Sequence, residues 1–181
     1  MGNDFTDLFG EWPQDSGNSR DDALNPDGMP EPENRIKRAI AVRECEVINI
    51  YEATYDGPVE EGGTPPKTTF VLLRDSQGRE LRIYVLPDVA FAMHLALTEQ
   101  TADRPYTHDL IKSIIIKLGA IVEHVTIDDL WRDTFYARIS LVTNGVSLDV
   151  DSRPSDAIAI ALRFNVPIYV SEAVLQATQQ E

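Results

Sequence analysis

The sequence predicts an α+β fold in which a mixed or antiparallel sheet carries helices on one side. Apolar and polar residues alternate over 135–143, which is the pattern of a half-buried strand. Asn144-Gly145 follows at once and is a strong signal for a type I′ hairpin turn. Twice, a strand-like segment leads into a proline that suits the first turn of a helix, at Pro87 and at Pro154.

The first half of the fold is predicted to contain a long strand, a loop, a hairpin and a helix. Residues 36–54 alternate like a strand, with a bulge expected near Cys45. Residues 56–67 contain three Gly or Pro clusters and form the loop. The hairpin pairs 68–75 with 80–86, and the helix runs from Pro87 to about Glu99.

A second helix is predicted to connect the two halves. Thr107 is a good N-cap, Asp109 lies in the first turn, and Gly119 follows the C-terminal end. The second half then continues with a strand over 120–127, an acidic turn at Asp128-Asp129 and the hairpin of 135–143 with 146–151. A helix follows from Pro154 to Asn165, which closes it. The chain ends with a short strand over 167–170 and a last helix capped by Ser171.

The two halves repeat each other weakly. Each runs from strand to hairpin to a helix that starts at proline, and residues 86–90 (LPDVA) compare with residues 153–157 (RPSDA). We therefore predict a duplicated βββα unit.

The N-terminal residues 1–35 are predicted to form a disordered acidic tail, and residues 36–181 to form the domain. The tail contains nine acidic residues and two arginines, which is half of the formal net charge of −14. Its apolar residues have helical spacing and are either scattered hydrophobes or a short docking helix: Phe5, Leu8, Phe9 and Trp12. Residues 36–181 still carry a net negative charge. This charge opposes the binding of nucleic acid unless a cation or a local basic patch assists.

Other features of the sequence indicate location and assembly. Cys45 is the only cysteine, no apolar run is long enough to cross a membrane, and no signal peptide is visible at the N-terminus. We expect a cytoplasmic protein without membrane contact, in which Cys45 is buried and inert. An exposed sheet edge and the turn at Trp131 favour a homo-oligomer, and a dimer is the favoured form.

The junction of strand and helix at residues 148–163 brings together the polar side chains best suited to catalysis or ligand binding. Asp149 and Asp151 share one face of the strand, and Asp156 lies in the first turn of the helix, with Ser152 or Arg153 at the cap position. One interpretation is helix capping alone. The other is a phosphate or divalent-metal site, because carboxylates bind hard cations and a helix N-terminus with an arginine binds phosphate.

Four segments resemble one known family in the same order along the chain. They are residues 104–110 (RPYTHDL), 134–137 (TFYA), 151–158 (DSRPSDAI) and 166–171 (VPIYVS). Together they are similar to the bifunctional nuclease domain family, from about Ile36 to Val174. This resemblance implies hydrolysis of phosphodiester bonds in DNA and RNA.

The resemblance and the chemistry of the side chains together predict roles for individual residues. Asp151 and Asp156 would bind Mg²⁺ or Mn²⁺, with Asp109 or Asp149 completing the metal ligands. Arg153 would hold a phosphate oxygen and His108 would carry a proton, which makes the catalytic group Asp151, Arg153, Asp156 and His108. The predicted substrate-binding residues are Arg104, Thr107, Ser155 and Tyr136.

Structural roles remain open for several of these residues. His108 could bond backbone near the helix start, and Tyr136 could pack within an aromatic strand. Ala90 also stands where, in our alignment, many family members carry a glutamate. A non-catalytic module that binds an anion or a protein, and a phosphoesterase for small substrates, are therefore alternatives to the nuclease.

Overall fold

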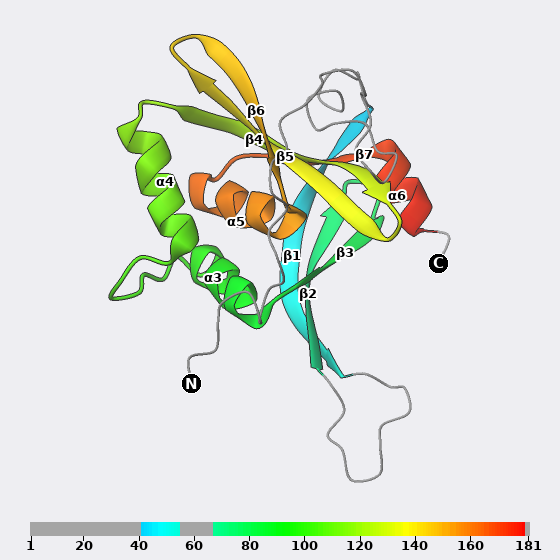
Figure 1. Ribbon diagram of the computed structural model, residues 1–181. Coiled ribbons are helices and arrows are strands. Elements are labelled where there is room, and N and C mark those ends of the chain that lie inside the picture. The colour runs from blue at the N-terminus through cyan, green and yellow to red at the C-terminus, as the bar shows by residue number, and fades with distance from the viewer. Residues whose placement is uncertain (1–40, 55–66, 180–181) are drawn as a thin grey trace, which may run out of the picture. The chain divides into compact units, whose positions relative to one another are not determined.

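A computed structural model describes residues 41–54 and 67–179, which belong to one compact unit, Ala39–Glu181 (Figure 1). The first half contains β1 (Val42–Thr54), β2 (Lys67–Asp75), β3 (Glu80–Val85) and α3 (Pro87–Leu97), and α4 (Thr107–Lys117) follows it. The second half contains β4 (Ile121–Trp131), β5 (Thr134–Thr143), β6 (Val146–Ser152) and α5 (Pro154–Phe164), and the chain ends with β7 (Ile168–Ser171) and α6 (Glu172–Thr178).

The strands form one mixed seven-stranded sheet in the order β3-β2-β1-β7-β4-β5-β6. β4 and β7 are parallel, and the other neighbouring strands of the described sheet are antiparallel. This confirms the predicted α+β fold with a mixed sheet.

The order of the strands agrees with the predicted duplication. Each half contributes an antiparallel meander that continues into a helix starting at proline. The short β7 lies between the first strands of the two halves, antiparallel to β1 and parallel to β4. The two meanders therefore run outward from β7 to opposite edges of the sheet.

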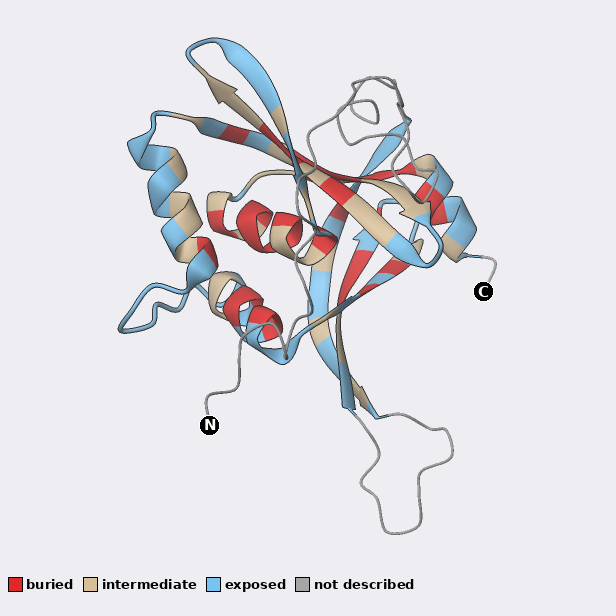
Figure 2. Ribbon diagram, viewed as in Figure 1, coloured by how far each residue is buried: buried red, intermediate tan, exposed pale blue. Residues whose placement is uncertain are grey.

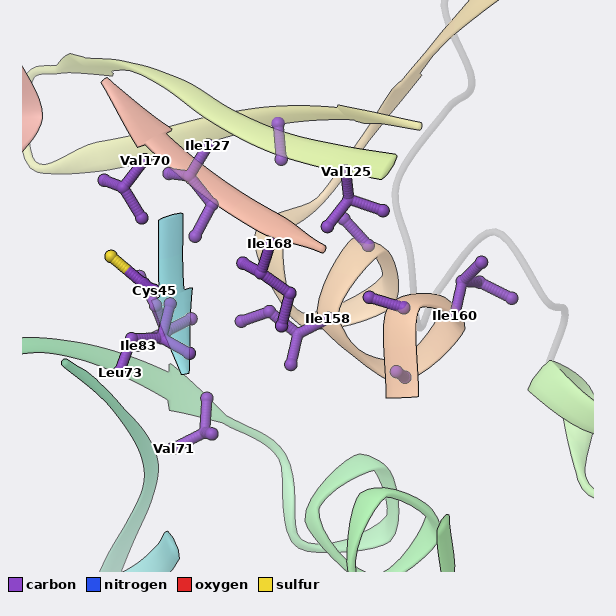
Figure 3. Packing of buried hydrophobic residues seen from close by; sticks show 14 of the residues in the cluster. Cys45, Val71, Leu73, Ile83, Val125, Ile127, Ile158, Ile160, Ile168 and Val170 are labelled. Atoms are coloured by element: carbon purple, nitrogen blue, oxygen red, sulfur yellow. The ribbon is translucent and has the colours of Figure 1, made fainter. Parts of the chain in front are cut away.

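One face of the sheet and the helices share a single hydrophobic core. Alternation along the strands directs the buried residues of neighbouring strands to the same side, as Figure 3 shows for Val71, Leu73, Ile83, Val125 and Ile168. The inner residues of α5, from Ala157 to Ala161, are all buried (Figure 2). Burying one Leu or Ile side chain is worth about 1.5–3 kcal/mol. The central position of α5 therefore fixes where its first turn, and the polar groups on it, must lie.

Three turn predictions are confirmed by backbone angles. Asn144 and Gly145 have φ values of 49° and 75°, as a type I′ turn requires. Asn165 adopts the left-handed conformation at the end of α5, and Gly119 does so just after α4.

Other local predictions were wrong. Asp128-Asp129 is not a turn, because a bulge between Ile127 and Asp129 lets β4 continue to Trp131. The chain reverses instead at Arg132-Asp133, where both φ values are positive. The bulge predicted near Cys45 is present, and it lies between Val47 and Asn49, shortly after that residue.

The first turns of two helices also differ from expectation. Thr107 is the first residue of α4 rather than its N-cap. Tyr106 occupies the cap position in an extended conformation, and its backbone N–H donates to Asp109 Oδ2 at 2.9 Å. Of the two cap candidates for α5, Arg153 holds the position.

Several predictions concern residues outside the described ranges. These are the acidic tail over 1–35 with its apolar residues, the first residues of the long strand and nearly all of the loop over 56–67. In the part of the chain that the structure describes, no helix is long and apolar enough to span a membrane. The cytoplasmic location stays a prediction.

Candidate functional site

The start of α5 holds an arginine and an aspartate against each other. Arg153 is extended at the cap position, Pro154 begins the helix, and Asp156 follows two residues later. The Arg153 side chain reaches back to Asp156, with Nε donating to Oδ2 at 2.7 Å and one terminal nitrogen donating to Oδ1 at 3.2 Å. The Arg153 side chain is 67% exposed. It therefore keeps further N–H donors for an external ligand.

His108 joins this pair from the first turn of α4. Its Nε2 lies 3.0 Å from Asp156 Oδ1, and the residue is only 6% exposed. An ionised carboxylate accepts hydrogen bonds but does not donate them, so Nε2 must carry the proton of this bond. Nδ1 is then the nitrogen of a neutral His108 that can accept another proton.

Asp156 stays ionised at neutral pH. Burial raises the pKa of its carboxyl, but the hydrogen bonds from Arg153 and His108 and the positive charge of Arg153 outweigh burial and hold that pKa below its usual value. The same ion pair raises the pKa of Arg153, against an opposing effect of burial. The group is thus a fixed carboxylate between an exposed cation and a buried imidazole.

These side chains line a pocket of about 370 Å³ where the first turns of α3, α4 and α5 meet. The backbone N–H groups of a first helical turn lack helical partners, and the helix dipole is positive there. Three helix starts around one pocket therefore favour an anion. The lining residues are Asp88, Val89, Ala92, Tyr106, Thr107, His108, Ile111, Arg153 and Asp156.

Two aromatic residues stand beside the pocket. Tyr106 lines it, and its ring contacts that of Phe91 edge to face, with 5.9 Å between the centroids. Both rings are substantially exposed. Such rings can stack against a planar group such as a nucleic-acid base.

Asp109 does not face this pocket but braces the helices around it. Its Oδ1 accepts a hydrogen bond of 2.6 Å from Nε of Arg163, whose side chain is 4% exposed. The other nitrogens of Arg163 donate to the carbonyl oxygens of Ala92 and Ala159. Asp109 therefore ties α4 to α3 and α5, and through them holds His108 against Asp156.

The remaining predicted carboxylates lie on the other face of the sheet. Asp151 lies opposite Arg138 in the pairing of β6 with β5, and the next residue, Ser152, lies opposite the buried Ala137. Because successive residues of a strand alternate between faces, Asp151 points away from the core. Asp149 accepts a hydrogen bond of 2.5 Å from Ser140 and shares the face of Asp151. The sheet thus separates both residues from Asp156 on the helix side.

This separation bears on the predicted metal site. The four predicted ligands do not converge, and the described residues contain no group of three or more His, Cys, Asp or Glu that could hold a metal ion. Both oxygens of Asp156 already accept hydrogen bonds. The described side chains therefore do not form the predicted carboxylate site for a divalent cation.

The predicted substrate-binding residues are divided in the same way. Thr107 lines the pocket. Arg104 is exposed in the segment between α3 and α4, and Ser155 is half-buried in the first turn of α5, but neither lines the pocket. Tyr136 lies on β5 two residues before Arg138, on the face of the sheet opposite to the core.

A family model for the bifunctional nuclease domain matches residues 71–181, which is more than half of the chain and includes every residue of the pocket. The chain belongs to the bifunctional nuclease domain family.

Several known proteins are similar to this chain over about the same length. An uncharacterised protein of Mycobacterium tuberculosis is 44% identical over 112 residues, 61% of this chain and 66% of the relative. Bifunctional nuclease 2 of Arabidopsis thaliana is 32% identical over 59% of this chain, and bifunctional nuclease 1 of Oryza sativa subsp. japonica is 28% identical over 61% of it. The chain spans about a third of these plant proteins. The family and the plant names support a nuclease-like function at the level of the family.

For this member of the bifunctional nuclease domain family, sequence reasoning missed two features of the pocket. Asp88 lines it from α3, whereas Ala90 is buried and does not. The repeat of Pro87-Asp88 and Pro154-Ser155-Asp156 was the available signal for Asp88. Tyr106 stood within a family segment, but its contact with Phe91 required the packing of α3 beside α4.

Proposed function

We propose that this protein is a nuclease that hydrolyses phosphodiester bonds of DNA and RNA in the pocket between α3, α4 and α5. One observation carries the proposal: the contact of Arg153, Asp156 and His108 in a pocket formed by three helix starts. Family membership supports the same reaction class.

In the proposed reaction the pocket first binds one phosphate of the chain. The N–H donors of Arg153 that do not face Asp156 bind the nonbridging oxygens, and the helix starts add positive potential. These contacts offset the charge that develops on the phosphate during attack. They also supply the local positive potential that a chain with a net charge of −14 otherwise lacks.

His108 is the proposed proton carrier. Its Nδ1 accepts a proton from the attacking water while Asp156 holds the ring through Nε2. The water oxygen bonds to phosphorus, the bond to one ester oxygen breaks, and that oxygen takes the proton back from His108. The products are one end with a phosphate and one end with a hydroxyl.

We expect single strands to be cleaved faster than duplexes. A pocket of about 370 Å³ has room for one nucleotide-sized group but not for a paired duplex. Phe91 and Tyr106 beside it offer rings on which an unpaired base stacks, worth about 1–3 kcal/mol per base.

Dependence on Mg²⁺ or Mn²⁺ stays a prediction from the sequence. Asp88 and Asp156 are the carboxylates among the residues that line the pocket, and Asp156 is already bonded to Arg153 and His108. Cleavage with Mg²⁺, with Mn²⁺ and with a chelator decides whether a cation is needed.

The test compares aspartates on the two faces of the sheet. The full chain is incubated with single- and double-stranded DNA and RNA beside Asp156→Asn and Asp151→Asn. We expect Asp156→Asn to lose cleavage and Asp151→Asn to keep it. The opposite result would assign the chemistry to the other face, and thermal melts of both variants exclude unfolding as the cause.

A non-catalytic module that binds an anion or a protein is the second candidate, and it would account for Ala90 at the position where the sequence alignment places a glutamate in many family members. In that case single-stranded nucleic acid or inorganic phosphate would bind in an Arg153-dependent manner. No strand would be cleaved under any metal condition.

A further inference from the structure

Aromatic side chains form a row across β1, β2 and β3, on the face of the sheet opposite to the core. Phe70 of β2 lies directly opposite Tyr51 of β1 on one side and Tyr84 of β3 on the other. The neighbouring residues Val71 and Ile83 belong to the core, so the aromatic side chains point away from it. The ring of Phe70 lies 5.5 Å from that of Tyr51 and 5.8 Å from that of Tyr84, measured between centroids. The rings therefore form one continuous aromatic surface, here called the aromatic row.

The aromatic row is open to solvent. Tyr84 is 64% exposed and Tyr51 is 39% exposed, while Phe70 between them is half-buried. Single exposed apolar residues are normal on a protein surface, whereas contiguous ones mark a place where another molecule binds. The aromatic row thus has more exposed ring surface than packing of the sheet requires.

Arg82 adds a cation to this surface. It is exposed, and its guanidinium carbon lies 5.5 Å from the centroid of the Phe70 ring. The next cross-strand row on the same face consists of Asn49, Leu72 and Arg82, so neither of these two described rows contains an acid. In a chain with a net charge of −14, such a surface is a place where a polyanion can approach.

The acids of this face stand one row further away. The third cross-strand row consists of Glu46, Arg74 and Glu80. Arg74 forms an ion pair of 2.6 Å with Glu80, which compensates that carboxylate. The aromatic row and Arg82 are therefore separated from the acids of the described strands.

We propose that the aromatic row, together with Arg82, binds the unpaired bases of single-stranded nucleic acid. The bases stack on the exposed rings, and Arg82 binds a phosphate oxygen. Sheets that bind RNA use aromatic side chains on neighbouring strands in this way to stack two or three bases. Binding at the row does not require cleavage, so the inference goes beyond the proposed function and does not depend on it.

The aromatic row leads toward the pocket at the helix starts. It ends at Tyr84 on the edge strand β3, which continues directly into α3 (Figure 1). Asp88, which lines the pocket, follows Tyr84 by four residues, a chain distance of at most about 14 Å. A nucleic-acid strand that lies along the row toward this edge therefore leaves the sheet beside the pocket.

Membership of the family does not account for the aromatic row. The family model matches from residue 71 onward, so Tyr51 and Phe70 precede the matched region. Tyr84 and Arg82 lie within it. The site is thus assembled from strands on both sides of that boundary.

Binding is tested with the full chain and a fluorescein-labelled oligothymidylate of about 15 nucleotides, by fluorescence anisotropy. Titrations are made with Mg²⁺ and with a chelator, and the length of the probe is checked after each, so that cleavage is not mistaken for release. Tyr84→Ala removes the most exposed ring of the row, and we expect it to weaken binding at least about fivefold. Tyr84→Phe keeps the ring and should bind within about twofold of the wild type.

Trp131 provides the matched control. It is 40% exposed, and the guanidinium carbon of Arg132 lies 5.8 Å from the centroid of its ring, but it lies in the second half at the end of β4. Trp131→Ala should leave the affinity within about twofold of the wild type. A loss as large as that of Tyr84→Ala would show that any exposed ring beside an arginine binds the probe, and the assignment to the aromatic row would fail.

An abasic oligonucleotide separates stacking from attraction to phosphate. Tyr84→Ala should bind this probe as tightly as the wild type does, because only stacking is lost. Arg82→Gln should weaken the binding of both probes and lower the slope of log K against log salt concentration by about one. A general loss of structure in Tyr84→Ala would instead weaken both probes.

Two results would overturn the proposal: no binding of the oligothymidylate by the wild type under either condition, or equal binding by the wild type and Tyr84→Ala. The aromatic row would then serve cross-strand packing or a protein partner. Cleavage of the probe is scored separately. Binding that depends on Tyr84 without any cleavage would contradict the nuclease but not the aromatic row, whereas cleavage with unchanged binding in Tyr84→Ala would contradict the aromatic row alone.

Discussion

The two halves of the domain start their helices with nearly the same backbone but with different side chains. Leu86 precedes α3 with φ −71° and ψ 149°, and Arg153 precedes α5 with φ −67° and ψ 145°. A proline follows at the first helical position in both. The first half adds Asp88 to the pocket, whereas the second half adds Arg153 and Asp156.

This difference shows that the shared backbone provides a location but not the chemistry. Both helix starts offer first-turn N–H groups and the positive end of a helix dipole to an anion. Only at α5 does a cation fold back on a carboxylate that also bonds an imidazole. The same contrast holds at the edges of the sheet, where β3 is charged and β6 is apolar.

The largest expected effect on cleavage comes from replacing Arg153, which precedes α5, by the leucine that occupies the equivalent position before α3. Arg153→Leu copies Leu86 onto a position with the same backbone angles, so the fold should persist. It removes the exposed phosphate-binding cation, and we expect the rate of nucleic-acid cleavage to fall by about 10²–10³-fold. Steady-state kinetics on a single-stranded substrate measure this.

The reverse substitution is the control. Leu86→Arg puts an arginine at the start of α3, where no imidazole pairs with Asp88 in the described structure. We expect it to change cleavage by less than the Arg153→Leu variant does. If Leu86→Arg restored activity to Arg153→Leu, the pocket would need only a cation, and the role assigned to the contact with Asp156 would fail.

A second prediction concerns the brace that holds the site together. Asp109→Ala leaves the buried Arg163 without its carboxylate and should lower the free energy of unfolding by about 2 kcal/mol. Asp88→Ala removes the first-turn acid of α3 and should cost less than about 1 kcal/mol. Urea denaturation of both variants tests the difference, and equal losses would show that Asp109 acts only on the helix dipole.

The pH dependence of stability gives a third test. The pKa of Asp156 is lower in the folded protein than in the unfolded chain, so its ionised form stabilises the fold above the unfolded value of about 3.9. This stabilisation is lost as the pH falls through the folded pKa. The difference in unfolding free energy between wild type and Asp156→Asn should therefore be constant from pH 7 to pH 5 and shrink below about pH 4. A difference that did not shrink below about pH 4 would show that ionised Asp156 does not contribute this stabilisation.

The sequence predicted the frame of the fold because its signals were local. Period-two alternation, Asn144-Gly145 and the prolines at 87 and 154 each depend on a few neighbouring residues, and each was confirmed. The turn at Asp128-Asp129 failed because a bulge, which depends on pairing with β5, absorbed those residues.

The site was only half predictable for the same reason. The contacts of Arg153 with Asp156 lie within one helical turn and follow from spacing. The side on which Asp151 points depends on its register with Arg138, and the contact of His108 with Asp156 spans 48 residues. The family segments identified these residues as candidates, but the pairing of the strands and the packing of the helices determine which of them line the same pocket.

The smallest expected effect tests whether the hairpins of the two halves are equivalent. Gly78 and Gly145 both have positive φ, and a Cβ at either position would meet no atom within 4 Å. Any loss in Gly78→Ala or Gly145→Ala therefore comes from backbone strain alone, and we expect about 1 kcal/mol in each by urea denaturation. Equal losses would confine the effect to the turns and make the two hairpins equivalent in energy, although only one of them leads to Arg153. A clearly larger loss in one variant would show that the two turns are not equivalent.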